Sequence, residues 1–334
     1  MRIGLSYDLK EDIKPVSDGA EDALEEYDSR ETVGLIAASL EAGGHSVTML
    51  GGGREFIANI LRQKVDFVFN IAEGRGNHRS REAQVPSVLE MLGIPYTGSD
   101  PLCLAICLNK PLAKKLVAPE GVSTPGWQLI ADSEGLKQVR WETFTFPVII
   151  KPACEGSSKG IRLTSVAESA SQARVEASRI LDGYRQPVMV EEFITGNEVT
   201  VGITGNSPPD VLGMMRIIPR RSNSRFVYSL EVKRDYKNQV EYECPAQLED
   251  EVREKIRLAS LKVFQTLGCR DFARIDFRIG SGGTPYFIEI NPLPGLGTHS
   301  DLVIMVLRLG WTHQELVDTV LNAALKRYPQ CVPA

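Results

Sequence analysis

Two short apolar segments near the C-terminal end of the chain carry polar residues that could do chemistry. Arg274 and Asp276 lie in the first segment, and Glu289 and Asn291 lie in the second. If residues 280–284 turn a hairpin between two strands, alternation of side chains places Asp276 opposite Glu289 and Arg274 opposite Asn291. Opposed carboxylates repel each other, and Mg²⁺ removes this repulsion while keeping coordination positions for phosphates. The pattern indicates a metal–nucleotide site; solvated carboxylates, or a structural ion pair with Arg274, are the alternatives.

A segment rich in glycine and serine, residues 151–160, is the second candidate. We expect it to join a buried strand at 148–151 to another strand at 161–164. Glycine and serine let backbone N–H groups and hydroxyls approach phosphate oxygens, although the segment is neither a P-loop nor a dinucleotide fingerprint. An ordinary turn is the alternative, but Lys151 favours the phosphate interpretation because a buried lysine needs a negative partner.

Two adjacent carboxylates, Glu191 and Glu192, end another apolar strand at 188–192. They could accept hydrogen bonds from an adenine amino group and from ribose hydroxyls. An ordinary polar strand end is the alternative.

Composition limits the classes of function. The chain has 334 residues, enough for two or three compact units, and its net charge of −5 argues against nucleic acid as the main partner. The lack of any apolar stretch of about 18 residues predicts no membrane partner, and the charged N-terminal residues predict no signal peptide. Six cysteines without a CxxC pair predict reduced thiols in the cytoplasm rather than disulfides or a zinc site.

Helical and extended patterns alternate along the chain, which predicts an α/β fold. We expect a parallel, Rossmann-like sheet in residues 1–100, with strands at 2–7, 46–50, 67–71 and 94–97 and a helix that begins at a capping box formed by Asp28 and Glu31. A compact unit at 101–192 should hold helices at 111–117 and 166–181, and a last unit at 193–334 should hold the hairpin. Residues 8–28 contain nine acidic residues and two lysines, and form either a solvated loop or a flap over the site.

In this order, the three signals resemble the ATP-grasp superfamily and, within it, the D-alanine–D-alanine ligases. The most specific stretches are residues 155–160, 274–276 and 289–300; the last is similar to the family pattern E-x-N-x-x-P-G-x-T-x-x-S. The resemblance implies an ATP-grasp fold: a Rossmann-like N-terminal domain, and two α+β domains at 101–192 and 193–334 that clamp ATP. It also implies a homodimer through the N-terminal unit.

The resemblance also implies a role for individual residues. ATP contacts are implied for Lys110, Lys151, Ser157, Ser158, Glu191, Glu192, Phe193, Ile194, Glu198 and Lys233. Two Mg²⁺ ions, or Mn²⁺, would be held by Asp276, Glu289 and Asn291. Catalytic roles are implied for Arg274, Lys233 and Ser157. Contacts with amino or carboxylic acid substrates are implied for Glu73, Arg234, Arg274, Gly297 and Ser300.

The implied reaction is ATP-dependent formation of an amide through an acyl phosphate, with release of ADP and phosphate. Such a reaction depends on positioning and charge neutralisation rather than on a protein nucleophile. Three functions stay open: a cell-wall dipeptide ligase, an amide ligase for other amino or carboxylic acids, and a nucleotide-binding regulator without turnover.

The chain departs from the family on the amino-acid side of the site. Glu73 stands where those ligases carry histidine, Arg234 where they carry tyrosine, and Gly297 where they carry threonine, while residues 8–28 replace a glycine-rich loop. Arginine suits bidentate carboxylate binding, so Arg234 predicts a substrate with more negative charge than alanine. The alternative is that Arg234 and the cations around it are solvated or serve ATP alone.

Overall fold

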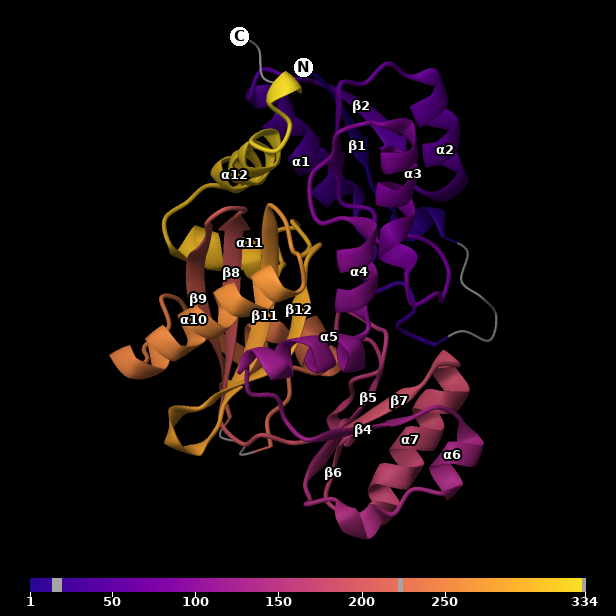
Figure 1. Cartoon of the computed structure of the whole chain (residues 1–334), viewed down its shortest axis with the longest axis vertical. Coiled ribbons are helices and arrows are strands. Elements are labelled where there is room, and N and C mark those ends of the chain that lie inside the picture. The colour runs from indigo at the N-terminus through magenta and orange to yellow at the C-terminus, as the bar shows by residue number, and fades with distance from the viewer. Residues whose placement is uncertain (14–19, 222–224, 332–334) are drawn as a thin grey trace.

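The computed structural model describes residues 1–13, 20–221 and 225–331, and contains three β-sheets with helices packed around them (Figure 1). The strands follow the order β2-β1-β3 in the first sheet, β4-β7-β5-β6 in the second and β10-β9-β8-β11-β12 in the third. The α/β class predicted from the sequence is confirmed. None of the helices in the described part of the chain is long and apolar enough to span a membrane.

The N-terminal sheet is parallel, as predicted. Its strands are β1 (Arg2–Ser6), β2 (Ser46–Gly51) and β3 (Phe67–Asn70), and its helices are α1 (Arg30–Ala42), α2 (Gly53–Arg62) and α3 (Gln84–Leu92). Two local predictions were wrong. Residues 94–97 form no strand, because only Tyr96 bridges to Val68. Helix α1 is capped by Ser29, whose side chain accepts from the backbone N–H of Thr32. Asp28, the predicted cap, instead forms backbone hydrogen bonds with Asp8 and Lys10, which follow β1.

The second sheet is antiparallel. Its strands are β4 (Trp127–Ile130), β5 (Val148–Pro152), β6 (Val166–Ala167) and β7 (Val188–Glu192), and it is covered by α6 (Ser133–Lys137) and α7 (Ala170–Tyr184). The strand expected at 161–164 was wrong: the segment after Gly160 leads into a 3₁₀ turn, and pairing with β5 begins only at Val166. The helix expected from 166 begins at Ala170, because Ser169 caps it.

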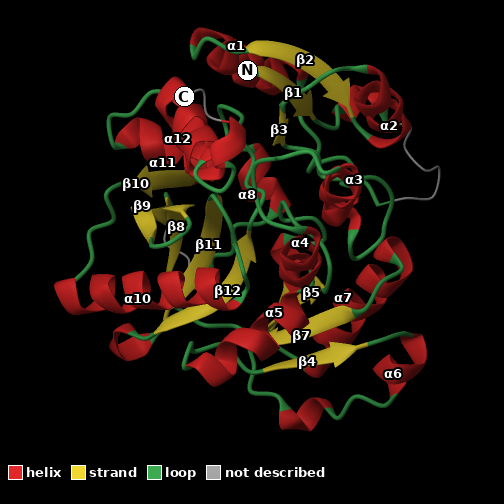
Figure 2. Ribbon diagram, turned by 45° about the horizontal axis from the view of Figure 1, so that its top comes forward, coloured by secondary structure: helices red, strands yellow, loops and turns green. Residues whose placement is uncertain are grey.

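The third sheet is also antiparallel and carries the hairpin. Its strands are β8 (Asn197–Gly205), β9 (Pro209–Pro219), β10 (Val240–Glu243), β11 (Phe272–Ile279) and β12 (Pro285–Asn291). The helices of this part are α8 (Leu230–Arg234), α9 (Tyr236–Gln239), α10 (Asp250–Thr266), α11 (Asp301–Arg308) and α12 (His313–Leu325). Figure 2 shows α10 lying beside this sheet, and α10 contacts β8, β9, β11 and β12.

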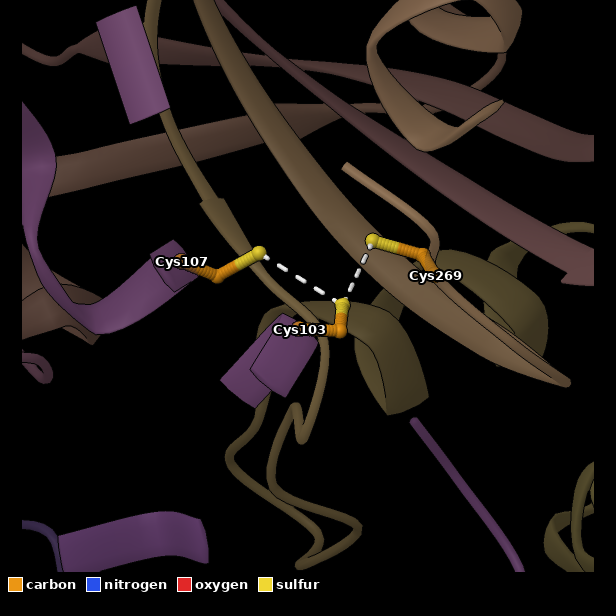
Figure 3. A group of neighbouring side chains, drawn as sticks. All are labelled: Cys103, Cys107 and Cys269. Atoms are coloured by element: carbon orange, nitrogen blue, oxygen red, sulfur yellow. Dashed lines mark hydrogen bonds between the residues drawn. The ribbon is translucent and has the colours of Figure 1, made fainter. Parts of the chain in front are cut away.

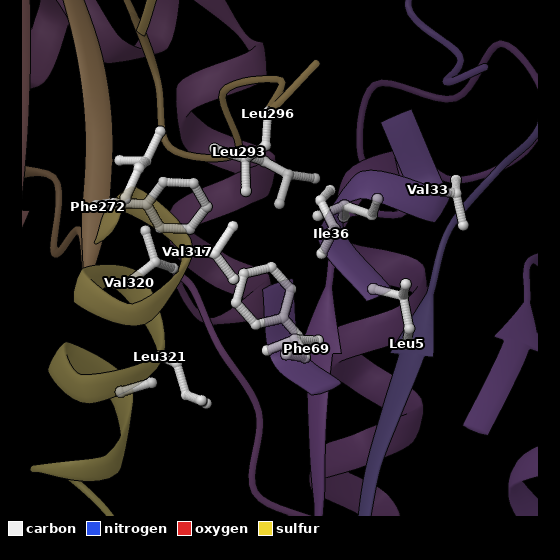
Figure 4. Close-up of a cluster of buried hydrophobic side chains, with 14 of the residues drawn as sticks. Leu5, Val33, Ile36, Phe69, Phe272, Leu293, Leu296, Val317, Val320 and Leu321 are labelled. Carbon is white, nitrogen blue, oxygen red and sulfur yellow. The ribbon is translucent and has the colours of Figure 1, made fainter. Parts of the chain in front are cut away.

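Two hydrophobic cores join segments that are far apart in the sequence. In the first, Leu5, Ile36 and Phe69 of the N-terminal unit pack with Phe272 of β11 and Val317 of α12 (Figure 4). In the second, α4 (Pro101–Leu108) and α5 (Lys110–Val117) pack against β11 and β12. The N-terminal unit is therefore anchored to the last helix of the chain, and α4 and α5 bring their polar ends to the hairpin. The domain boundaries stay a prediction.

Candidate functional site

The hairpin of β11 and β12 has the predicted register. Asp276 pairs with Glu289, Ile275 with Ile290, and Arg274 with Asn291, and a bulge follows Asp276. The guanidinium of Arg274 lies 2.9 Å from Asp276 Oδ2 and 3.9 Å from Glu289 Oε1. The ion pair with Arg274 that was one alternative is thus present, and its residues line a cavity rather than a solvated face.

A third carboxylate completes this cluster. Asp301, the first residue of α11, lies 3.3 Å from Arg274, with its Oδ2 facing the guanidinium Nη1. The sequence analysis missed it, although it directly follows the matched stretch 289–300. Thr200 of β8 was also missed; its hydroxyl donates to Asp276 Oδ1 at 2.9 Å.

The two opposed carboxylates have opposite electrostatic environments. Burial raises the pKa of Asp276, and the contribution of Glu289 adds to this rise against the attraction of Arg274. Burial alone would also raise the pKa of Glu289, but Lys110, Lys151 and Arg274 together hold it well below its usual range. Lys110 Nζ lies 3.1 Å from Glu289 Oε2. The pair therefore presents one firmly ionised carboxylate and one that a further cation would help to ionise.

A main cavity extends from the hairpin to the second sheet. Most of the residues predicted to contact ATP line it: Lys151, Ser157, Ser158, Glu191, Glu192, Phe193, Ile194, Glu198 and Lys233. Arg274, Asp276 and Glu289 line the same cavity. Burial lowers the pKa of Lys233, with Asp301 opposing the shift and Arg274 adding to it. The sheet that carries β5 and β7 and the sheet that carries β11 and β12 thus form its two walls.

Two lysines neutralise the buried carboxylate of Glu191. Its oxygens lie 2.6 Å from Lys151 Nζ and 2.8 Å from Lys114 Nζ. Burial would raise the pKa of Glu191, but the two lysines lower it. The prediction that Lys151 needs a negative partner holds, but in this structure the partner is Glu191. The expected contact of Glu191 with adenine therefore competes with two ion pairs, because a carboxylate so deeply buried needs neutralisation. Lys114, four residues after Lys110 on α5, was missed.

At the other end of the main cavity, Glu198 faces Arg278. Their charged groups are 3.6 Å apart, and the Arg278 guanidinium lies 4.5 Å from the ring centroid of Phe193. Burial raises the pKa of Glu198 to about 7, with Arg278 opposing the shift and Asp276 adding to it. The sequence analysis missed Arg278, although it follows Arg274 and Asp276 at the same period of two.

A second, acidic cavity lies next to the first. It is lined by Glu26, Glu73, Glu82, Glu155 and Glu289, together with Cys107, Lys110, Ser157, Arg274 and Asn291. Lys110 and Asn291 were predicted for the site and line only this second cavity. Ser157, Arg274 and Glu289 line both cavities, so the two spaces meet at these residues.

Two of these carboxylates belong to a closed ion network. Glu26 and Glu155 both contact Arg81, at 2.6 and 3.0 Å, and both contact Lys159, at 3.0 and 2.6 Å. The four charges neutralise one another. Glu26 belongs to the acidic segment 8–28, which was expected to form either a solvated loop or a flap.

The described part of that segment packs against the loop at 151–160. Asp22 accepts from the backbone N–H of Gly160 at 2.9 Å and from the hydroxyl of Tyr184. Asp22 is fully buried, so the solvated-loop alternative does not hold for residues 20–28. Residues 14–19 lie outside the described residues.

Glu73 and Glu82 differ from the other carboxylates of the acidic cavity. No ion pair of the described residues includes either side chain, and Oε2 of the buried Glu82 has no hydrogen-bonding partner. Burial raises the pKa of both carboxyl groups; Glu82 raises that of Glu73 further, whereas Arg81 opposes the rise at Glu82. The cavity therefore offers two poorly compensated carboxylates to a positively charged group.

Three predicted substrate residues lie away from both cavities. Arg234 is paired with Glu21 at 3.1 Å and with Glu25 at 2.7 Å. Its positive charge is neutralised by the acidic segment in this structure, and a contact with a substrate carboxylate stays a prediction. Ser300 precedes α11, and Gly297 packs so closely against α1 that an added Cβ would lie 2.6 Å from Thr32 Oγ1. This contact accounts for glycine where the family carries threonine.

Ser157 and Ser158 of the loop at 151–160 have backbone φ angles of +51° and +58°, which are uncommon for residues other than glycine. The hydroxyl of Ser158 donates to the Tyr228 carbonyl at 3.0 Å, whereas Ser157 faces both cavities. Of the two, Ser157 is the one whose side chain stands between the two spaces.

Comparisons with known proteins agree with this geometry. A family model for the C-terminus of D-Ala–D-Ala ligases matches residues 116–322. The D-alanine–D-alanine ligase of Aquifex aeolicus is 33% identical over 295 residues, which cover 88% of this chain and 94% of that protein. The uncharacterised protein y4sG of Sinorhizobium fredii is 32% identical over 303 residues, with coverage of 88% and 87%.

The fold has a close counterpart among solved structures. The D-alanine–D-alanine ligase from Bacillus anthracis complexed with ATP superposes with a TM-score of 0.76, at 23% identity and over 99% of each chain. At this identity the match establishes the fold alone, while the family model and the Aquifex relative establish the family. The chain therefore belongs to the D-alanine–D-alanine ligase family and is an ATP-dependent ligase with an ATP-grasp fold.

Proposed function

We propose that the main cavity binds ATP, that the acidic cavity binds an amino acid through its ammonium group, and that the carboxylate of this amino acid is activated where the cavities meet. The observation that carries the proposal is that Ser157, Arg274 and Glu289 line both cavities. A nucleotide lying along the main cavity would bring its γ-phosphate to the residues that an amino acid in the acidic cavity would also reach.

The proposed reaction has two steps. A carboxylate oxygen of the first amino acid attacks the γ-phosphorus, and ADP leaves. The amine of a second amino acid then attacks the acyl carbon of the acyl phosphate, phosphate leaves, and an amide bond results. Arg274, already surrounded by three carboxylates, would neutralise the oxyanion of the tetrahedral intermediate.

The lysines would exchange partners when ATP binds. Lys110 contacts Glu289, and Lys151 contacts Glu191. Each would turn to a phosphate oxygen, where a charge-assisted hydrogen bond contributes about 1.5–3 kcal/mol. Lys233 of α8, whose pKa is lowered by burial, would contact the phosphates at its end of the main cavity.

The residues opposite Lys110 fit a hard divalent cation. Asp276 and Glu289 provide carboxylate oxygens, and Asn291 provides an amide oxygen that accepts from the Leu293 N–H at 2.9 Å and keeps a second lone pair. We assign two Mg²⁺ ions to these three residues, with Mn²⁺ as a possible substitute. When bound, the ions neutralise phosphate charge during transfer.

Glu73 and Glu82 suggest the class of the first substrate. Two poorly compensated carboxyl groups favour an ammonium group and disfavour additional negative charge. D-Alanine, named for the relatives, is the first candidate, and amino acids with a second amino group are a further candidate that the charge of this cavity favours. Arg234, from which an acidic substrate was expected, is paired with Glu21 and Glu25 instead.

An assay of ADP release tests this proposal. The full chain with Mg-ATP is supplied with D- and L-amino acids that are neutral, basic or acidic. We expect turnover with neutral or basic amino acids and little with acidic ones, and we expect Glu82→Gln to raise KM for the amino acid far more than KM for ATP. Turnover best supported by an acidic amino acid, or an unchanged amino-acid KM in Glu82→Gln, would contradict the assignment of the acidic cavity.

Two further points belong to the proposal. The dependence on ATP is consistent with a cytoplasmic enzyme, and the resemblance to the family suggests a homodimer formed through the N-terminal unit. Analytical ultracentrifugation at several protein concentrations would measure the oligomeric state, and a monomer throughout would refute the dimer.

A further inference from the structure

Three cysteines from two distant parts of the sequence meet in the interior. Cys103 and Cys107 lie one turn apart on α4, and Cys269 lies three residues before the start of β11 (Figure 3). Cys103 Sγ is 3.8 Å from Cys107 Sγ and 3.5 Å from Cys269 Sγ, and all three sulfurs lie within 4.8 Å of one another. The sequence predicted free thiols rather than disulfides or a zinc site; the cysteines are free, and the spacing of Cys103 and Cys107 gave no sign that Cys269 would join them.

The triangle of sulfurs has the size that a metal ion requires. With sides of 3.8 and 3.5 Å and a third side of at most 4.8 Å, the point equidistant from the sulfurs lies at most about 2.4 Å from each, close to a typical metal–thiolate bond of about 2.3 Å. Three thiols that merely pack as small apolar side chains need not converge on one point in this way. The geometry alone is therefore that of a three-coordinate thiolate site.

The surroundings select the kind of ion. Cys103, Cys107 and Cys269 are 2, 3 and 7% exposed and form part of the core between α4, α5 and β11. No histidine or carboxylate of the described residues joins the group. Structural zinc takes four ligands, whereas soft thiolate ligands also select Cu(I), which accepts three. A buried, three-sulfur site without a fourth protein ligand thus fits a soft monovalent ion better than zinc.

We propose that Cys103, Cys107 and Cys269 form a binding site for a soft, thiophilic metal ion of the Cu(I) type. Each metal–sulfur bond replaces an S–H bond whose proton leaves to solvent, and the oxidation state of the ion does not change. Affinity should therefore rise with pH. Cys103 lies in the first turn of α4, where the helix dipole favours a thiolate.

The position of the cluster links it to the substrate side of the enzyme. Cys107 lines the acidic cavity, which gives an ion a route from solvent to the sulfurs. Only Leu108 and Asn109 separate Cys107 from Lys110, the residue that contacts Glu289. Occupancy that shifts the end of α4 would shift Lys110 as well, so bound metal should lower ligase activity.

The binding test does not depend on the substrate of the enzyme. The reduced full chain is titrated anaerobically with Cu(I) in competition with a chromophoric Cu(I) chelator, and bound copper is counted by mass spectrometry. We expect one Cu(I) per chain. Cys103→Ser and Cys269→Ser should weaken binding by more than the roughly 10–100-fold typical of losing an outer-shell partner. Cys244→Ser and Cys331→Ser, which change cysteines outside the cluster, should leave it unchanged.

Each outcome decides the proposal. Fewer than one bound Cu(I) per wild-type chain would overturn the proposal. So would a loss of Cu(I) affinity in the Cys244→Ser and Cys331→Ser controls that equals the loss in the cluster variants. If the cluster variants unfold, the wild-type stoichiometry, together with the sulfur–copper distance from X-ray absorption spectroscopy, still decides: about 2.3 Å to three sulfurs supports the site, and two-sulfur or nitrogen coordination refutes it. Inhibition of ADP release by Cu(I) that persists in Cys103→Ser would refute only the coupling to Lys110.

Discussion

Glu198 offers a quantitative test of the electrostatics of the main cavity. Its side chain is only 17% exposed, and its pKa rises from 4.5 to about 7, chiefly because burial disfavours the ionised form and because Arg278 compensates only in part. The folded protein therefore binds a proton at Glu198 more tightly than the unfolded chain does. One pKa unit corresponds to about 1.4 kcal/mol, so ionised Glu198 destabilises the folded state by about 3 kcal/mol.

The change Glu198→Gln replaces the carboxyl group with a neutral group of the same shape. Below pH 4.5 the wild-type side chain is neutral in both states, so the variant should have the same free energy of unfolding as the wild type. Between pH 4.5 and about 7 the wild type loses stability relative to the variant, and above pH 7 the variant should be more stable by about 3 kcal/mol. Urea unfolding of the metal-free protein at a series of pH values measures this difference.

Glu289→Gln is the matched control, because it makes the same change in the same cavity. Lys110, Lys151 and Arg274 lower the pKa of Glu289 against the effect of burial, so ionised Glu289 stabilises the folded state above its unfolded pKa. This variant should be less stable than the wild type at pH 7, and the difference should shrink as the pH falls. A stability difference for Glu198→Gln that does not change with pH, or the same sign for both variants at pH 8, would refute the reasoning.

Three other predictions concern catalysis and nucleotide binding. Asp276→Asn should abolish ADP release at saturating Mg²⁺ while circular dichroism shows an intact fold, and full activity would contradict the metal assignment. Lys110→Ala should weaken ATP binding by about tenfold or more, since a charge-assisted contact contributes about 1.5–3 kcal/mol; calorimetry with an unchanged Kd would exclude this role. Arg234→Tyr should change the amino-acid KM little, because the exposed Arg234 side chain is paired with Glu21 and Glu25 and such pairs contribute about 1 kcal/mol or less; a large rise in that KM would restore Arg234 as a substrate residue.

The sequence by itself determined the features that depend on local periodicity. Alternation along two strands predicted that Asp276 lies opposite Glu289, and β11 and β12 have this register. A run of apolar residues predicted strand 188–192 with its observed ends. In β11 and β12 alternate residues must be apolar on the buried face, so a slip of one position would expose the core.

Only the tertiary structure decided which charges neutralise one another. Glu191 was predicted to contact a nucleotide, but in the structure it forms ion pairs with Lys114 and Lys151. Arg234 was predicted to contact a substrate, but in the structure it forms ion pairs with Glu21 and Glu25. A long charged side chain can pair with any segment that folding brings near it. Such long-range pairs produce no periodic pattern in the sequence, so they cannot be predicted from it.

The same limit applies to the cysteines and to the acidic cavity. The spacing of Cys103 and Cys107 shows that they share a helix face. Cys269 belongs to a distant segment and joins them only because α4 and β11 pack in one core. The resemblance had already implied a substrate contact for Glu73, but Glu82 became a candidate ligand for an ammonium group only because no ion pair of the described residues includes it. Local patterns thus predicted most of the strands and the resemblance to a family implied the reaction class, whereas long-range packing decided which polar groups stay available for a ligand.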